Sequence, residues 1–66
     1  MNEATENVDT WLWFEPHLRQ HVKTVCKKPA DFKVLCEKIW GTATPDWKSL
    51  DDVEWGKLCE KWTENG

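Results

Sequence analysis

Six tryptophans have to be accommodated by a chain of only 66 residues, and this limits what the chain can fold into. A buried tryptophan removes roughly 150–250 Å² from water. A domain of this size buries only about 60% of the surface of its unfolded chain. We therefore expect tryptophans to supply the stability that other small domains take from disulfides or metals. Because so small a core cannot enclose all six, we also expect one to three of them to stay exposed.

Apolar residues recur at helical spacing along the chain. No strand-like alternation and no hairpin turn interrupts this pattern. The sequence therefore predicts an all-α fold, a compact bundle of four to five short helices. One domain is expected over residues 7–63, with a flexible N-terminal tail at 1–6 and a C-terminal tail at 64–66.

Prolines and a glycine divide the helical pattern. A short first helix is expected from a cap at Asn7, and Pro16 suits the first turn of a second helix that runs to about Lys27. A single helix kinked at Pro16 is the alternative. The clearest amphipathic helix begins at Pro29 and stops at Gly41, because glycine adopts a left-handed cap at no steric cost.

The last third of the chain begins with a connector, residues 42–48. Thr44 in this connector is expected to cap a single helical turn, and Ser49 is expected to cap a final helix over about 50–62. Gly56 falls inside that helix, where it costs about 1 kcal/mol relative to alanine. Either a neighbouring helix comes close at this glycine, or the helix begins later than its cap indicates.

The tryptophans divide according to their place in this pattern. Four fall on apolar stripes and are expected to anchor the core: Trp11, Trp40, Trp55 and Trp62. Trp13 lies beside the first stripe and Trp47 lies in the connector, so these two are the candidates for exposure. An exposed tryptophan among charged residues is typical of a protein-binding hot spot, and the alternative for each of the two is core filling.

Charge is segregated along a chain whose net charge is −3. Residues 16–40 hold six of the nine basic residues, whereas residues 1–15 hold four acidic residues and no basic one. The simpler interpretation is that oppositely charged segments attract one another within one fold. The sharper interpretation is that Arg19, Lys23 and Lys27 form a basic contact face beside an exposed tryptophan.

The residues that carry chemistry do not form a recognisable catalytic or metal pattern. Three cysteines, Cys26, Cys36 and Cys59, lie in apolar surroundings, which predicts buried free thiols in an intracellular protein of the cytoplasm or nucleus. His17 and His21 are four residues apart, but no cysteine pair has the spacing of a zinc site, so we expect neither a metal nor another cofactor. No nucleophile is placed beside a base, and no glycine-rich phosphate loop occurs, so we do not expect an enzyme.

These observations favour a non-enzymatic protein–protein interaction module. Such a chain could be a domain of a regulatory protein or a small viral or phage inhibitor of a host protein, and self-association is one form of the binding. The alternative is a small helical nucleic-acid-binding domain of helix-turn-helix or Myb-like type, because residues 16–38 are basic. The acidic balance of the chain and of its last helix argues against that alternative. No apolar run approaches the roughly 20 residues of a membrane span, so no membrane partner is expected.

The segment from Val8 to Phe14 resembles the first-helix signature of sterile alpha motif domains, especially the Pointed subtype. In that signature a valine is followed three residues later by Trp-Leu and then by a further aromatic residue. Val8, Trp11, Leu12 and Phe14 occupy those positions. The resemblance implies a five-helix bundle used for protein association. The chain departs from the family at Pro16, which falls where the first helix would be ending.

Overall fold

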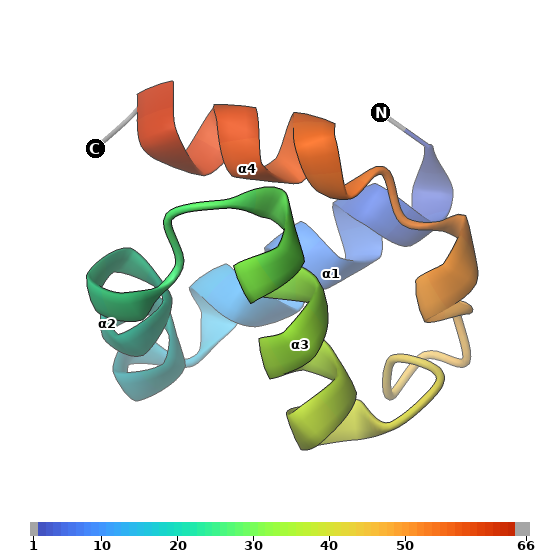
Figure 1. Cartoon of the computed structure of the whole chain (residues 1–66). Helices are drawn as coiled ribbons and strands as arrows, with labels where there is room; N and C mark the ends of the chain where they lie inside the picture. The colour runs from blue at the N-terminus through green and yellow to red at the C-terminus, as the bar shows by residue number, and fades with distance from the viewer. Residues whose placement is uncertain (1, 65–66) are drawn as a thin grey trace.

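The structure is a computed structural model of the chain, and it describes residues 2–64. Four α-helices and one 3₁₀ turn follow one another along the chain: α1 (Glu3–Phe14), α2 (Pro16–Val25), α3 (Pro29–Trp40), η1 (Leu50–Asp52) and α4 (Trp55–Glu64). The helices pack around one core, and the Cα atoms span 27 × 22 × 18 Å (Figure 1). The prediction of an all-α bundle of short helices is confirmed.

The first helix begins earlier than the sequence indicated. Asn2, and not Asn7, is its cap, because the Asn2 side-chain oxygen accepts hydrogen bonds from the Thr5 backbone N–H at 2.9 Å and from the Thr5 hydroxyl at 2.6 Å. Ala4 and Thr5 are buried. The expected flexible tail at 1–6 is therefore wrong for residues 3–6, which form the first turn of α1.

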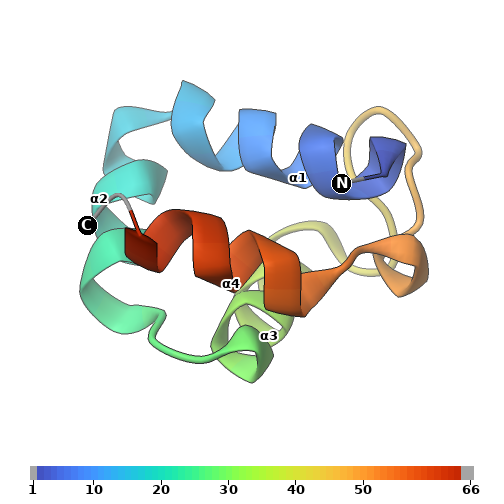
Figure 2. The ribbon, with the colours of Figure 1, turned by 90° about the horizontal axis from the view of Figure 1, so that it is seen from above.

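The chain also joins this N-terminal turn to its last third. The Asn2 side chain donates to the Asp52 carbonyl at 2.7 Å, and the Glu54 backbone N–H donates to the Thr5 hydroxyl at 2.8 Å. As a result, α1 and α4 run side by side and in the same direction (Figure 2). Of the expected C-terminal tail, residue 64 ends α4, and 65–66 lie outside the described residues.

Proline and glycine mark three further helix ends as predicted, whereas α2 ends at Val25, before the predicted Lys27. Glu15 has extended backbone geometry, as a residue before proline prefers, so α1 and α2 are two helices and not one kinked helix. Pro29 opens α3. Gly41 ends α3 at a φ of 83°, a value that side-chain-bearing residues rarely adopt.

The predicted final helix is divided in two. Ser49 caps as expected, since its hydroxyl accepts from the Asp51 N–H at 3.2 Å, but this cap starts only the three-residue η1. The α-helix begins at Trp55, so Gly56 lies in its first turn, and a Cβ at Gly56 would meet no atom within 4 Å. The alternative of a late helix start is therefore correct. Thr44 caps no helical turn, and its hydroxyl accepts from the Lys48 N–H instead.

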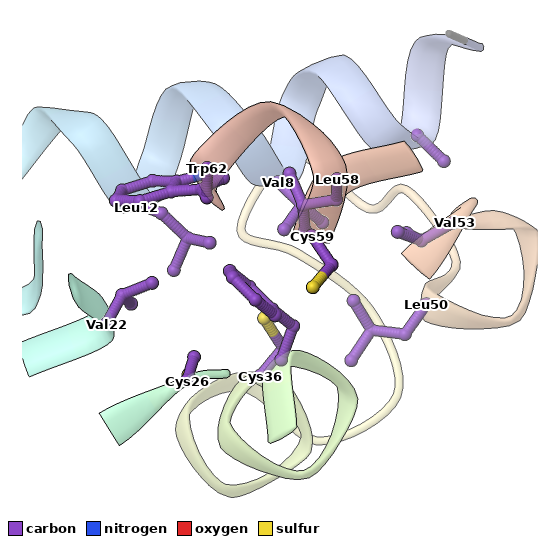
Figure 3. Packing of buried hydrophobic residues seen from close by; sticks show 12 residues of the cluster. Val8, Leu12, Val22, Cys26, Cys36, Leu50, Val53, Leu58, Cys59 and Trp62 are labelled. Atoms are coloured by element: carbon purple, nitrogen blue, oxygen red, sulfur yellow. The ribbon is translucent and has the colours of Figure 1, made fainter. Parts of the chain in front are cut away.

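The core lies where the four helices meet. Val8 and Leu58 face each other across α1 and α4, and Trp62 lies over Leu12 (Figure 3). The three cysteine thiols are buried and free, as predicted. Burial raises the pKa of the Cys36 thiol to about 12.

The tryptophans anchor this core less uniformly than their stripes indicated. Trp62 is the buried one, whereas Trp40 and Trp55 are half-buried and pack against the core from outside. Trp11 is half-buried as well, and its ring contacts Phe14 edge-on with the ring centroids 5.9 Å apart. The expectation of four core tryptophans is therefore wrong for Trp11, which lies at the surface of α1.

Candidate functional site

Trp13 is not the exposed residue that its position suggested. Its ring stacks on that of Trp62, with centroids 4.7 Å apart and an angle of 24° between the planes. Trp62 reaches this position because α4 lies alongside α1. Trp13 is therefore half-buried against the core, and the prediction of its exposure is wrong.

Two cations also lie close to the Trp13 ring. The Arg19 guanidinium carbon is 5.4 Å from the Trp13 ring centroid, and the Lys23 ammonium is 5.0 Å from it. Both distances are within the range of about 6 Å in which an aromatic ring attracts a cation. Arg19 also donates to the Trp13 carbonyl at 3.2 Å. The structure thus brings together three of the candidate contact residues, Trp13, Arg19 and Lys23.

The acidic segments do not neutralise this basic helix. Within residues 2–64, the two ion pairs join Lys48 to Glu3 at 3.5 Å and Lys61 to Asp9. Neither pair uses a basic residue of the segment 16–40. The segment 16–40 therefore makes no close ion pair with the acidic ends within residues 2–64, and a longer-range attraction between these segments stays a prediction.

A pocket of about 360 Å³ opens between the C-terminal ends of α2 and α4, and we call it the α2–α4 pocket. Its floor is apolar and is formed by Val22, Cys26, Phe32 and Trp62. Its rim carries Lys23 and Lys27, which lie one turn apart along the chain. The third basic candidate, Lys27, thus lies at the same end of the molecule as Arg19 and Lys23.

Trp47 is exposed, as predicted. It presents 88% of its surface to solvent, the largest fraction of any large apolar residue that the structure describes. Its φ is 67°, in the left-handed region, which is unusual for a bulky side chain. Such a conformation costs of order 1–3 kcal/mol and persists only where the surroundings hold it.

Hydrogen bonds hold the connector around Trp47. The Asp46 carboxylate accepts from the Asn7 side chain at 2.8 Å and from the Trp11 indole N–H at 3.0 Å. These two hydrogen bonds lower the pKa of Asp46. The Trp47 N–H donates to the Thr44 carbonyl at 2.8 Å, which closes a tight turn. Asp46 therefore fixes the connector, and the backbone of Trp47 with it, to α1.

Polar and charged residues surround this indole. Beside it is a shallow hollow of about 440 Å³, and its lining includes Asn2, Glu3, Lys48 and Asp52. The Lys48–Glu3 ion pair crosses this lining. We call Trp47 together with this hollow the Trp47 surface.

The candidate contact residues therefore form two groups instead of one surface. The connector that carries Trp47 and the helix α2 lie at opposite ends of the molecule in two perpendicular views (Figures 1 and 2). Trp47 stands alone on one end. Trp13, Arg19, Lys23 and Lys27 lie at the other.

The sequence also contained an important residue whose role was missed. Asp9, which the pattern treated as a favourable acid in a first turn, is buried and accepts a hydrogen bond from the Trp62 indole N–H at 2.9 Å. The Lys61 ammonium pairs with its other oxygen. The two partners are more than 50 residues away in sequence, so no local signal identifies them.

Two other possible features are a metal site and a membrane-spanning helix. No three histidine, cysteine or acidic side chains of residues 2–64 gather closely enough to hold a metal ion. Over the same range, no helix has the length and apolar character needed to cross a membrane. Comparisons of the chain with protein-family models, with curated proteins and with solved structures gave no match.

Proposed function

We propose that the chain is a non-enzymatic protein-binding module whose principal contact is Trp47. The observation that carries this proposal is the 88% exposure of a tryptophan on a connector that hydrogen bonds hold in a left-handed conformation. A mobile loop would lose backbone freedom on binding, whereas the backbone that carries Trp47 is already held by hydrogen bonds. Tryptophan is also the residue type most enriched at interface hot spots.

The surroundings of Trp47 support the same function. A large exposed apolar group inside a charged rim is the arrangement found at the centres of protein interfaces. The resemblance of residues 8–14 to sterile alpha motif domains, which associate with proteins, adds to the proposal. The buried free thiols support a reducing, intracellular setting for a regulatory domain or a small viral or phage inhibitor.

Affinity capture from the native cell's lysate tests the proposal. The immobilised chain is compared with Trp47→Ala and with the matched control Phe14→Ala, which also removes a mostly exposed aromatic ring (75% exposed). We expect one or more proteins to be retained by the parent chain and by Phe14→Ala but lost with Trp47→Ala. Circular dichroism of all three confirms that they are folded. Identical captured sets with Trp47→Ala and the parent chain would contradict the proposal.

One observation favours nucleic-acid binding as a second candidate function. Arg19, Lys23 and Lys27 repeat every four residues, and no carboxylate of residues 2–64 pairs with them. Such a row of cations can contact phosphates. Binding to random duplex DNA, measured by fluorescence anisotropy, would then weaken with rising salt and disappear in the triple variant with glutamate at these positions. Binding that is absent even at low salt would exclude this candidate.

A further inference from the structure

The α2–α4 pocket has the features of a second binding site, at the end of the molecule opposite to Trp47. Its floor residues Val22, Cys26, Phe32 and Trp62 are each more than nine-tenths buried, so the pocket leads directly to the core. Its volume of about 360 Å³ lies within the range of roughly 300–1,000 Å³ typical of ligand pockets. A floor of this kind fits one bulky apolar side chain.

The rim of the pocket carries two lysines that form no ion pair within residues 2–64, and the nearby Asp31 carboxylate accepts from the Lys27 and Lys28 backbone N–H groups at 3.0 Å. The Lys27 ammonium donates to the Lys23 carbonyl at 3.2 Å, so a cation covers the negative end of α2, which would otherwise repel an anion. The Lys23 ammonium is held over the Trp13 ring, next to Arg19. Two cations, Lys23 and Lys27, thus line an opening with an apolar floor, and Arg19 lies near Lys23 at the Trp13 ring.

We propose that this pocket binds a second protein through a short acidic peptide segment that carries one bulky apolar side chain. The carboxylates of the segment contact Lys23 and Lys27, and its apolar side chain lies on Phe32 and Trp62. This proposal goes beyond the Trp47 surface and does not depend on it. With both surfaces, the chain joins two partners at opposite ends of one small bundle.

The chemistry of the pocket distinguishes this partner from two others. A nucleic acid would satisfy the cations but leave the apolar floor uncovered. Trp47 of a second copy of this chain lies beside both acidic and basic side chains, Glu3, Asp46 and Lys48, so its charge matches the lysine rim less well than that of an all-acidic segment. An acidic peptide with an apolar anchor matches both the charge and the floor.

Titration of the ¹⁵N-labelled full chain with short blocked peptides tests the proposal by NMR. The probe is Glu-Glu-Phe-Glu-Glu, and the controls are Glu-Glu-Ser-Glu-Glu and Lys-Lys-Phe-Lys-Lys. We expect the probe to shift the indole N–H signal of Trp62 and the amide signals of Lys23 and Lys27, with a dissociation constant on the order of 100 μM. Each control should bind about tenfold more weakly, because it lacks either the anchor or the charge. Absence of shifts with the probe, or equal binding of the serine control, would overturn the proposal.

Two variants separate this site from the Trp47 surface. Lys23→Gln/Lys27→Gln removes two charges without reversing them, and we expect about tenfold weaker binding of the probe. Trp47→Ala should bind the probe as the parent chain does, even if it loses the proteins captured through Trp47. Shifts confined to residues outside the pocket, or displacement of the probe by random duplex DNA at equal concentration, would contradict the assignment. So would a rise of molecular mass with concentration that Trp47→Ala abolishes, because it would assign the pocket to a second copy.

Discussion

Trp13 and Trp47 both fall outside the apolar stripes of their segments, yet they have opposite environments. Trp13 stacks on Trp62 and is contacted by Arg19 and Lys23. Trp47 has no such covering and is held in solvent by a connector that α1 fixes through Asp46. Leaving the stripe therefore does not decide the exposure of a tryptophan. The exposure of the tryptophan depends on whether a segment distant in sequence packs against its ring.

The sharpest test of this comparison is the removal of the ring that covers Trp13. Trp62→Ala deletes a buried indole, its stack on Trp13 and its hydrogen bond to Asp9, so we expect a loss of about 3–5 kcal/mol in the free energy of unfolding. Trp47→Ala should change it by less than about 0.5 kcal/mol. Urea unfolding followed by circular dichroism measures both. Similar losses in the two variants would show that Trp47 supports the fold after all.

A smaller loss of stability is expected from substitutions of Asp9, which accepts the hydrogen bond of the Trp62 indole. Asp9→Ala leaves a buried N–H without its partner, and we expect a loss of about 1–3 kcal/mol in the free energy of unfolding. Asp9→Asn keeps an oxygen that can accept from Trp62, so it should lose less. The same urea experiment ranks the two variants. An equal loss would mean that the charge facing Lys61, and not the hydrogen bond, accounts for the contribution of Asp9.

The backbone at Trp47 can be tested separately from its side chain. Glycine adopts a positive φ without the steric cost that a Cβ imposes, so Trp47→Gly should be about 1 kcal/mol more stable than Trp47→Ala. Thermal unfolding of the two variants gives the difference. Both variants should lose the partner captured through Trp47. If alanine were the more stable of the two, the connector would not hold the left-handed conformation in solution.

The smallest effect expected at the Trp47 end concerns pH and the Asp46 carboxylate. The pKa of Asp46 is lowered in the folded chain, so its stabilising contribution is present above the unfolded value of about 3.9 and is lost as the pH falls through the lower folded value. The Trp11 indole N–H signal should therefore shift in this acid range in an NMR titration. Asp46→Asn, which cannot titrate, is the control and should show no such step. A step of equal size in the control would assign the shift to another acid.

The sequence predicted the local features of the fold better than its long-range contacts. Proline and glycine act within a few residues, and Pro16, Pro29 and Gly41 accordingly mark helix ends where they were expected. The early start of α1 was missed because Asn7 and Asn2 are equally good caps by type. Only the contact of Asn2 with Asp52 and the burial of Thr5 distinguish them.

The candidate site was predictable to the same extent. The exposure of Trp47 followed from its place in the connector, which carries no helical stripe. The covering of Trp13 depends on Trp62, which is 49 residues away, and no local pattern contains that information. The α2–α4 pocket was missed for the same reason, since its floor and rim come from three helices.

The long-range contacts of α1 also affect when the chain can fold while a ribosome is synthesising it. Thr5 forms a hydrogen bond with Glu54, which is 49 residues away in sequence. Asp9 forms one with Trp62, which is 53 residues away. The apolar stripe of α1 packs on α2 as well, and α4 covers the rest of it only when the last turn of α4 has left the ribosome. Folding of this segment during translation is completed only at that point. Any product that stops short of Trp62 presents part of that stripe to chaperones and proteases.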